Sequence, residues 1–508
     1  MGISPYAAIV IGSKNMLMKV YEISGGKGFR TVDEIRYEYE LGKEAYFTRK
    51  ITFAQIEEIC NVLMEFQQRM REYAITEFRC YATSAIRNAK NQVSVLNQIK
   101  IRTGVDVIML SNSELRFLMY KGIQVLDIDF NKIIEKNTAI LDIGSGSVQV
   151  SLFDKQALYM TQNLDIGTVK VRGFLESVEN NVFDYISVLE EYIQYEFDMF
   201  KSGYLKDKDI KNVIAIGDEI KNINRLIPEL HLTDTMSYEQ ILYIYKKIKK
   251  ASYQDIALKY GLSIEDARMV LPSVLIYKTF LERSKADTVY ICATNLCDGS
   301  VVDYAQETKK IKLSHDFYQD IVASAKYIGK RYRYSKVHAQ YLALEIFDKT
   351  KKFHGLTQRD RLILEISAIL HDIGKYVNLN DPGKNGYQLI MSTEIMGLSH
   401  REREEVANIV LYNTQELPDT DELDTAFWRE EYLRIAKLSS ILRLANALDR
   451  GHKQKLEKCS MARKGKELII SLETNQDITL EITRFSKKAE TFSEFTGITP
   501  VLKQKRAL

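Results

Sequence analysis

The chain has 508 residues, more than one hydrophobic core usually serves, so its length predicts several domains. Apolar residues make up 45 % and charged residues 27 % of it, ordinary values for a globular protein, and no apolar run approaches the roughly 20 residues that cross a bilayer. The net charge of +3 is too small to predict nucleic-acid binding, and the N-terminus has no secretory signal pattern. We therefore expect a cytoplasmic protein without membrane or nucleic-acid partners.

Two stretches far apart in the chain share one pattern. Residues 7–15 read AAIVIGSKN and residues 138–147 read TAILDIGSGS, in each case a buried strand followed by a small polar loop. Such a loop lets backbone N–H groups approach a phosphate. Each loop is followed by strand, turn and strand, at 15–41 and 147–167. The duplication predicts two α/β lobes that face each other across a cleft and share a phosphate ligand.

The duplicated loops differ at one position that matters for chemistry. An offset of 132 residues aligns Gly12 with Gly144 and Ser13 with Ser145. The same offset places Val10 opposite Asp142, so only the second loop follows a strand that carries a carboxylate. Carboxylates beside bound phosphates hold metal ions or act on water. The first lobe therefore lacks a chemical group that the second lobe has.

The periodicity changes beyond residue 305. Before it, residues 53–73 form a helical pattern between the two loops, and after it residues 313–450 are helical nearly throughout. The last stretch returns to strand patterns at 467–473 and 478–485, with a short helix. The sequence thus predicts four domains, at 1–125, 126–305, 306–452 and 453–508.

Five motifs follow one another along the chain. They are YATSAIRNAKN at 81–91, LDIGSGS at 141–147, LDIGTVKV at 164–171, LHDIGKY at 370–376 and KLSSILRLANALDRGH at 437–452. Each motif is weak alone, but the five in this order are specific. In this set the chain resembles the exopolyphosphatases and guanosine pentaphosphate phosphohydrolases, and the resemblance covers most of its length.

The resemblance implies a fold for each of the four predicted domains. Residues 1–125 and 126–305 would be two actin-like, sugar-kinase-like (ribonuclease H-like) α/β lobes. Residues 306–452 would be an all-α HD-type domain, and residues 453–508 a small α+β C-terminal domain. The implied activity is hydrolysis of a phosphoanhydride or phosphoester in polyphosphate, a guanosine nucleotide or another nucleotide. A divalent metal, magnesium or manganese, and a homodimer are implied as well.

The resemblance also names the residues that would bind phosphate. Arg87, in TSAIR, matches the phosphate-binding arginine of the family, and a guanidinium makes a bidentate fork to phosphate oxygens. The two glycine-rich turns would present backbone N–H groups to the same ligand. The complete predicted set is Gly12, Ser13, Arg87, Gly144, Ser145, Gly146 and Ser147.

Several positions of the predicted cleft depart from the family pattern. The first loop has Val10 where an aspartate is usual and Lys14 where an asparagine is usual. Gln149 replaces the glutamate that follows the second loop, and the acidic pair 218–219 replaces a Gly-Thr pair. Of the acidic residues that the family pattern requires, Asp142 remains clearly in place.

The departure with the largest chemical effect lies in LSNSELRFLMYKG, at 110–122. The family usually reads Ser-Gly-x-Glu-Glu-Ala here, with the second glutamate as the implied catalytic base. Aligning on Ser111 and Gly122 puts Leu115 at that position and leaves Glu114 one residue early, about 100° around a helix. Loss of a general base typically costs 10²- to 10⁴-fold in rate. The lobes are therefore predicted to bind phosphate better than they hydrolyse it.

The helical domain retains a complete set of candidate metal ligands. HD-type phosphohydrolases have a histidine, an adjacent His-Asp pair and a distant aspartate, and His338, His371, Asp372 and Asp449 match this order. Imidazole and carboxylate ligands together suit manganese, iron, zinc or magnesium, and such an ion lowers the pKa of bound water. A purely structural histidine and aspartate are the alternative, and Lys375 either contacts phosphate or closes a helix.

Three functions follow from these observations. The first is a phosphohydrolase with an impaired cleft, in which Asp142 or Glu114 acts between the lobes and Asp372 acts at the metal of the HD-type domain. The second is a non-catalytic sensor that binds polyphosphate or an alarmone. The third is an ordinary exopolyphosphatase in which a relocated carboxylate, Glu114 or Glu219, replaces the missing base.

Overall fold

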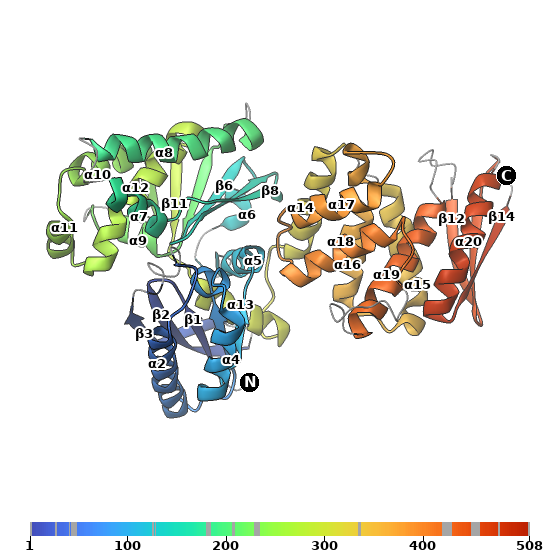
Figure 1. Ribbon diagram of the computed structural model, residues 1–508, viewed down its shortest axis with the longest axis horizontal. Coiled ribbons are helices and arrows are strands. Elements are labelled where there is room, and N and C mark those ends of the chain that lie inside the picture. Colours follow the sequence, from blue (N-terminus) through green and yellow to red (C-terminus); the bar gives the residue numbers. More distant parts are fainter. Residues whose placement is uncertain are drawn as a thin grey trace. The chain divides into compact units, whose positions relative to one another are not determined.

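The chain divides into two units, Met1–Phe317 (unit 1) and Tyr318–Leu508 (unit 2). The structure is a computed structural model, and it describes residues 3–25, 28–39, 41, 48–123, 126, 129–178, 184–205, 209–227, 234–333, 337–418, 429–448, 458–475 and 478–505. Figure 1 shows the elements of both units. Within the described residues, no helix combines the length and the apolar character that a membrane span requires.

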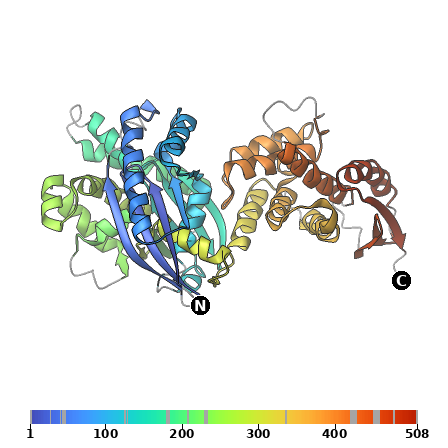
Figure 2. The same cartoon turned by 90° about the horizontal axis from the view of Figure 1, so that it is seen from below.

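The first half of unit 1 is a mixed sheet with helices on it. Its elements are β1 (Ser4–Ile11), β2 (Asn15–Ser24), β3 (Gly28–Glu38), α2 (Phe53–Glu72), β4 (Phe78–Ala82), α3 (Ser84–Arg87), α4 (Gln92–Thr103), β5 (Val107–Met109) and α5 (Asn112–Ile123). Among the described strands the order is β3-β2-β1-β4-β5. The first three strands pair antiparallel, and β1 pairs parallel with β4. These long strands are coloured blue in Figure 2.

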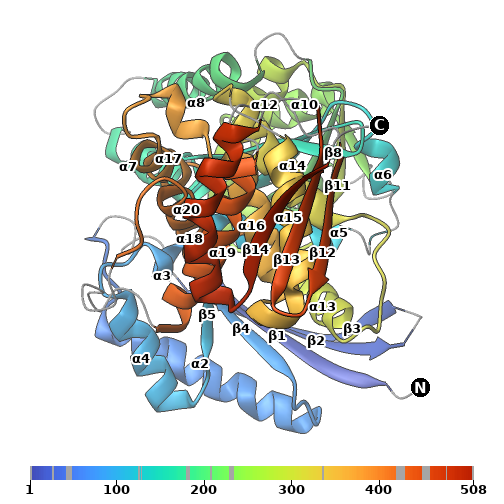
Figure 3. The same ribbon diagram turned by 90° about the vertical axis from the view of Figure 1, so that its right-hand side faces the viewer.

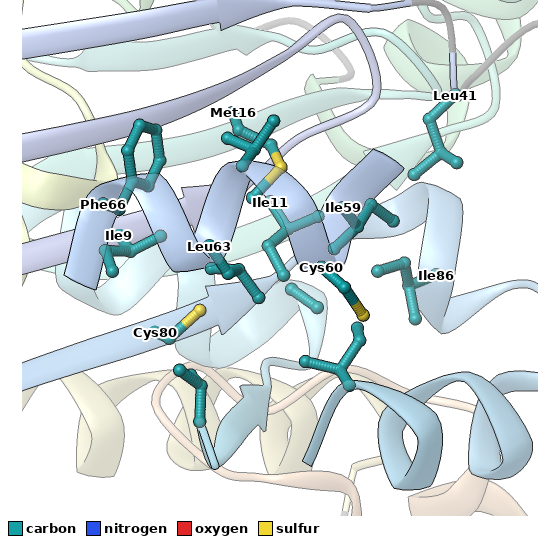
Figure 4. Packing of buried hydrophobic residues seen from close by; sticks show 14 of the residues in the cluster. Ile9, Ile11, Met16, Leu41, Ile59, Cys60, Leu63, Phe66, Cys80 and Ile86 are labelled. Atoms are coloured by element: carbon teal, nitrogen blue, oxygen red, sulfur yellow. The ribbon is translucent and has the colours of Figure 1, made fainter. Parts of the chain in front are cut away.

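Alternation along β1 sends successive side chains to the two faces of this sheet. Ile9 and Ile11 are buried beneath α2 with Leu63 and Phe66, as Figure 4 shows. Helix α2 begins with a capping box in which Thr52 and Gln55 satisfy each other's backbone N–H groups. Its buried apolar positions recur at helical spacing, so the periodicity that predicted this helix also identifies the face that packs on the sheet.

The second half of unit 1 repeats this architecture with a larger helical layer. Its elements are α6 (Phe130–Ile133), β6 (Thr138–Ile143), β7 (Val148–Asp154), β8 (Ala157–Leu164), α7 (Thr168–Val178), α8 (Tyr185–Phe200), the π-helix η1 (Lys201–Leu205), β9 (Asn212–Ile216), α9 (Asp218–Asn224), β10 (Thr235–Ser237), α10 (Tyr238–Ile248), α11 (Tyr253–Tyr260), α12 (Ile264–Ser284), β11 (Thr288–Cys292) and α13 (Leu296–Glu307). The described strands follow the order β10-β11-β9-β6-β7-β8.

The two sheets have equivalent topologies. The order β3-β2-β1-β4-β5 in the first matches β8-β7-β6-β9-β11 in the second, with the same antiparallel and parallel pairings around β1 and β6. The duplication that the two loops predicted is therefore confirmed. Helix α13, although it follows the second sheet in the chain, packs its Cys297, Val301 and Ala305 against the first sheet. The last helix of unit 1 therefore packs on the sheet that is formed by the first residues of the chain.

Unit 2 begins with a group of helices. They are α14 (Phe317–Arg331), α15 (Val337–His354), α16 (Gln358–Leu370), the 3-10 helix η3 (Ile373–Tyr376), α17 (Pro382–Met391), α18 (His400–Tyr412) and α19 (Arg429–Leu448). Local signals explain where several of them begin. Thr357 with Asp360, and Ser399 with Glu402, form capping boxes, and Asp381 caps α17 ahead of its proline.

The C-terminal part of unit 2 is a small sheet with one long helix. Strands β12 (Lys458–Lys464) and β13 (Glu467–Glu473) pair antiparallel, and β14 (Thr499–Lys505) lies parallel to β13. Helix α20 (Thr479–Thr496) connects β13 to β14 and lies beside the sheet in Figure 3. The strand predicted at 478–485 is therefore wrong, and the helix predicted for this stretch is present but longer than expected. Buried Ile478, Phe485 and Phe492 recur every seven residues, which is two helical turns.

Candidate functional site

A cleft of about 210 Å³ lies between the two halves of unit 1. Both glycine loops line it, with residues 12–15 from the first half and residues 143–147 from the second. Side chains of chemical interest that also line it are Val10, Arg87, Asn112, Leu115, Asp142, Gln149, Asp218 and Glu219. The structure thus brings together all of the predicted phosphate-binding residues: Gly12, Ser13, Arg87, Gly144, Ser145, Gly146 and Ser147.

The two loops form the same tight turn. The N–H of Gly12 donates to the carbonyl of Asn15 at 2.9 Å, and the N–H of Gly144 donates to the carbonyl of Ser147 at 2.9 Å. A Cβ at Gly12 would lie 2.8 Å from the Asn15 carbonyl oxygen, so the turn excludes a side chain there. A Cβ at Gly144 would lie 3.2 Å from the Ser147 carbonyl oxygen, so both turns need a glycine to close, and tight glycine turns of this kind allow backbone N–H groups to approach a phosphate.

The start of α7 holds the second loop in place. The N–H groups of Thr168 and Val169 donate to the carbonyls of Gly144 and Ser145, each at 3.0 Å. Gly167 lies so close to the loop that a Cβ there would be 2.3 Å from the Ser145 carbonyl oxygen. The motif LDIGTVKV is thus explained by packing, since its glycine allows the helix to approach the loop.

Arg87 is anchored at the end of the short helix α3. Its guanidinium donates to the carbonyl of Leu110 at 2.8 Å and to the side-chain oxygen of Asn112. Both of these partners are uncharged, so the two bonds orient the guanidinium without cancelling its positive charge. The arrangement suits an arginine that holds a phosphate.

Asp142 is the buried carboxyl group at the end of β6. Its pKa is raised to about 7, mainly by burial and also by the nearby carboxylates of Glu219 and Asp218, although the charge of Arg116 acts in the opposite direction. In the first half the equivalent Val10 packs against the apolar cluster beneath α13. A carboxylate at that position would have to displace apolar contacts that the valine makes.

In the first turn of α5, the neighbouring residues Glu114 and Leu115 have different roles. Leu115 lines the cleft, at the position where the family resemblance implied a catalytic base. The carboxylate of Glu114 instead accepts a hydrogen bond from the N–H of Ser111 at 2.9 Å, and the hydroxyl of Ser111 accepts from the N–H of Glu114 at 3.2 Å. This reciprocal pair is a capping box, so Glu114 is placed to begin the helix.

Arg116, the next residue, was missed by the sequence reasoning. It is completely buried, and its Nε donates to the Oε1 of Gln149 at 2.9 Å, while its guanidinium also donates to Thr161. A helix of the first half thus reaches two strands of the second half. One feature of the sequence could have indicated this contact. Arg116 stands where the family pattern has an alanine, directly after Leu115 at the position of the implied base.

Two ion pairs cross the cleft between the halves. Lys14, in the first loop, lies 2.6 Å from Glu219 in the first turn of α9, and Arg36, on β3, lies 3.2 Å from Asp218. Burial lowers the pKa of Lys14, but the charge and hydrogen bond of Glu219, together with the charges of Asp266 and Asp218, outweigh this effect and the pKa is raised. The two acidic residues that depart from the family pattern are therefore each paired with a basic residue of the opposite half.

Comparison with protein families agrees with this geometry. Residues 19–308 match the model described as Ppx/GppA phosphatase family, and residues 323–488 match the model described as Ppx/GppA phosphatase, domain III. The chain belongs to the Ppx/GppA phosphatase family. The resemblance inferred from the five motifs is confirmed, and it extends over both units.

Individual relatives of the Ppx/GppA family are distant in sequence. A guanosine-5'-triphosphate,3'-diphosphate pyrophosphatase from Vibrio campbellii is 20 % identical over 484 residues, 93 % of each chain. A bifunctional 3-dehydroquinate synthase/phosphatase from Fusobacterium nucleatum is 21 % identical, and this chain spans 46 % of that protein's length. The crystal structure of an exopolyphosphatase from Cytophaga hutchinsonii matches 60 % of this chain and 98 % of its own at 15 % identity, with a TM-score of 0.53. This likeness confirms the predicted actin-like α/β fold.

Ppx/GppA phosphatases generally depend on a divalent metal. The cleft of this member offers apolar or amide side chains at Val10, Leu115 and Gln149, where the family resemblance implied carboxylates. Across the described ranges, no group of three or more His, Cys, Asp or Glu side chains is placed to hold a metal ion. The donor set of the cleft therefore does not fit a divalent metal.

The His-Asp pair of unit 2 lies where α16 ends. His371 and Asp372 are 1 % and 2 % exposed, and the His371 Nε2 lies 3.6 Å from a carboxylate oxygen of Asp372. The Nδ1 of His371 is 2.7 Å from the carbonyl of Ala368, and Lys375 donates to Asp372 at 2.6 Å. Asp449 and the side chain of His338 lie outside the described residues, so the complete predicted ligand set stays a prediction.

Proposed function

We propose that the cleft of unit 1 binds the terminal phosphate of a phosphoanhydride, in polyphosphate or a guanosine nucleotide, and hydrolyses it slowly. The observation that carries the proposal is the lining of the cleft. Both glycine turns and Arg87 are present for binding, whereas Leu115 occupies the place of the base. Relatives named as exopolyphosphatase and as guanosine-5'-triphosphate,3'-diphosphate pyrophosphatase support this class of substrate.

Asp142 is the proposed base of any residual hydrolysis. Its pKa of about 7 lies near neutral pH, where a carboxylate is most effective as a general base. Asp218 and Glu219 are engaged in ion pairs, and Glu114 is engaged in the cap of α5. We therefore assign the slow turnover to Asp142 and not to a relocated glutamate.

Restoring the missing carboxylates tests this proposal. Phosphate release from tripolyphosphate and from guanosine nucleotides is measured for the wild type, for Leu115→Glu and for Leu115→Glu with Gln149→Glu. We expect the wild type to bind these ligands and turn them over slowly, and the added base to raise the rate at least 10²-fold. Leu118→Met on the same helix is the matched control. Rapid turnover by the wild type, lost in Asp142→Asn or Glu114→Gln, would contradict the impaired cleft.

The sensor alternative gives a distinct result in the same experiment. Binding that depends on Arg87, with no phosphate release from the wild type or from the restored variants, would favour a non-catalytic sensor. Arg87→Ala is expected to weaken binding at least tenfold, because a charged hydrogen-bonding fork to the phosphate is lost. Unchanged affinity in Arg87→Ala would place the ligand outside the cleft.

A second candidate function belongs to the HD-type domain, which we propose at residues 306–452. The bond from His371 Nδ1–H to the carbonyl of Ala368 leaves Nε2 as the basic nitrogen, the state in which histidine binds a metal. With His338, Asp372 and Asp449, it would hold magnesium or manganese, which supplies an activated water when bound. Elemental analysis of the full chain should show about one metal ion per chain, lost in His371→Asn; absence of metal from the wild type would refute this site.

The remaining predictions concern organisation. We propose lobes at 1–125 and 126–305, a small C-terminal α+β domain at 453–508, and a homodimer in the cytoplasm. The boundaries near 125 and 452 fall beside residues that the structure leaves undescribed. Sedimentation equilibrium of the full chain should give twice the mass of one chain, and a single-chain mass would refute the dimer.

A further inference from the structure

We infer that the cleft of unit 1 binds its phosphate ligand without a divalent cation, because basic side chains of the protein take the electrostatic role that a metal has elsewhere. The inference rests on the proposed function, since it concerns how the same cleft recognises phosphate. It contradicts the metal dependence that membership of the family implies for this site. Three features of the described cleft support it.

The first feature is that salt bridges engage two of the three acidic side chains that line the described cleft. Glu219 pairs with Lys14 at 2.6 Å and Asp218 pairs with Arg36 at 3.2 Å, while Asp142 lies within the influence of the charge of Arg116. A magnesium ion needs oxygen ligands in near-octahedral geometry and binds carboxylates that can turn toward it. Here a metal ion would have to displace the salt bridge of Asp218 or Glu219, or bind Asp142 against the positive charge of Arg116.

The second feature is the pair of buried side chains behind the second loop. Asp142 and Gln149 are direct partners across β6 and β7, so their side chains lie on the same face of the sheet. Arg116 donates its Nε–H to the Oε1 of Gln149 at 2.9 Å. Because a guanidinium only donates hydrogen bonds, it fixes the amide oxygen toward itself. Gln149 lines the cleft, and with its oxygen engaged by Arg116 its remaining polar group is a donor NH₂, which suits an anion rather than a metal ion.

The third feature is the position of Lys14 within a phosphate loop. Its Nζ is bound to the carboxylate of Glu219, which also accepts from Ser273 at 3.1 Å. In this structure the Glu219 carboxylate is the partner of the Lys14 ammonium group. Lys14 belongs to the glycine turn, whose shape suits a phosphate. Because an ammonium group has three N–H donors, Lys14 can donate to a phosphate oxygen in the turn while it keeps its bond to Glu219. This arrangement needs no added cation, whereas a metal-bridged phosphate would compete with Lys14 for the same oxygen atoms.

Calorimetric titration of the full chain with tripolyphosphate tests the inference. The titration is made once in EDTA and once with millimolar magnesium, and again with manganese. We expect the Kd in EDTA to be equal to or lower than the Kd with either metal. Binding at least tenfold tighter with metal than in EDTA would overturn the inference and leave the proposed function standing. Absence of binding in all three buffers would overturn the proposed function, and this inference with it.

Two variants separate the electrostatic cause from a general effect on folding. Val10→Asp adds a carboxylate beside the first loop without removing a buried cation, and should weaken binding in EDTA at least tenfold and make it respond to magnesium. Lys14→Met should weaken binding in EDTA. Lys100→Met is the matched control, because Lys100 is 61 % exposed and pairs with Asp106 on the far side of the first half. Wild-type affinities for Val10→Asp in both buffers would overturn the inference.

Discussion

At the scale of single residues, the cleft differs from the pattern that the family resemblance implied by a small number of side chains. Leu115 lines it at the position of the implied base, and a leucine cannot accept a proton. Val10 packs into the apolar cluster beneath α13, and Gln149 holds the guanidinium of Arg116. These residues are well packed or hydrogen-bonded where they are. The loss of carboxylates is therefore built into the structure of the cleft and does not leave defects in it.

The ionisation of Asp142 gives a prediction for stability. Its pKa is raised from 3.8, the value expected in the unfolded chain, to about 7 in the folded protein, and burial is the largest cause. The protonated carboxyl therefore stabilises the fold below about pH 4, and this contribution is lost as the pH rises through 7. Asp142→Asn, which stays neutral, should equal the wild type at pH 4 and exceed its free energy of unfolding by about 1–3 kcal/mol at pH 8.

Denaturant unfolding at both pH values measures this difference. The control is Asp106→Asn, because the side chain of Asp106 is 77 % exposed and lies in a surface ion pair with Lys100. A stability difference between Asp142→Asn and the wild type that is the same at pH 4 and pH 8 would contradict the raised pKa.

The ion pair between Lys14 and Glu219 gives a second prediction at this scale. Their side chains are 16 % and 5 % exposed, so water screens their attraction less than at the surface. A double-mutant cycle with Lys14→Met and Glu219→Gln should yield a coupling energy of about 1–2 kcal/mol. The exposed pair Lys100–Asp106 should yield less than about 1 kcal/mol. Equal coupling energies for the two pairs would show that the cleft does not shield its ion pair.

At the scale of elements, two equivalent glycine turns and the first turn of helix α5 position the residues of the cleft. The turns after β1 and β6 close with the same N–H to carbonyl bond between a glycine and the third residue after it. Helix α5 contributes differently to the cleft at successive positions: Glu114 caps it, Leu115 lines the cleft and Arg116 crosses to the second sheet. A shift of one residue along this helix would exchange these roles.

The capping role of Glu114 predicts how two substitutions differ. Glutamine can accept the same hydrogen bond from the N–H of Ser111, so Glu114→Gln should keep the wild-type stability and any residual phosphate release. Alanine cannot, so Glu114→Ala should lower the free energy of unfolding by about 0.5–1 kcal/mol. Denaturant unfolding and a phosphate-release assay check both. A catalytic Glu114 would instead lose activity in the glutamine variant while the stability stays unchanged.

At the scale of the whole molecule, the chain consists of two units with their own cores. The cleft lies entirely within unit 1, and the His-Asp pair lies entirely within unit 2. Helix α13 returns to the first sheet, so the two halves of unit 1 are joined by two connections of the chain. The units are therefore expected to respond separately to a ligand and to a substitution.

Calorimetric unfolding of the full chain tests this separation. Tripolyphosphate at 100 times its Kd should raise the stability of one transition by about 2.7 kcal/mol and leave the other unchanged. Phe485→Ala, which removes a buried ring from α20, should lower the other transition by about 3–5 kcal/mol. A single transition that shifts with both perturbations would show that the two units unfold together.

The sequence predicted the elements that depend on local or repeated patterns. The offset of 132 residues predicted the duplicated sheets, because a strand followed by a glycine turn has a local signature. The strand predicted at 478–485 failed, because the apolar residues Ile478, Leu480 and Ile482 alternate locally, whereas the buried apolar residues Ile478, Phe485 and Phe492 are spaced by seven, as on one face of a helix. Arg116 was missed because its partners, Gln149 and Thr161, are brought to it only by the packing of the halves.

The amino-acid sequence by itself determined which ionisable groups this family member has, and therefore that Val10 and Leu115 cannot act as acids or bases. The tertiary structure decided which groups face each other. Lys14 and Glu219 are far apart in the chain and depart from the family separately, yet they meet across the cleft. The physical reason is that ionisation is a property of each side chain, whereas attraction between charges depends on a distance that only the folded chain sets.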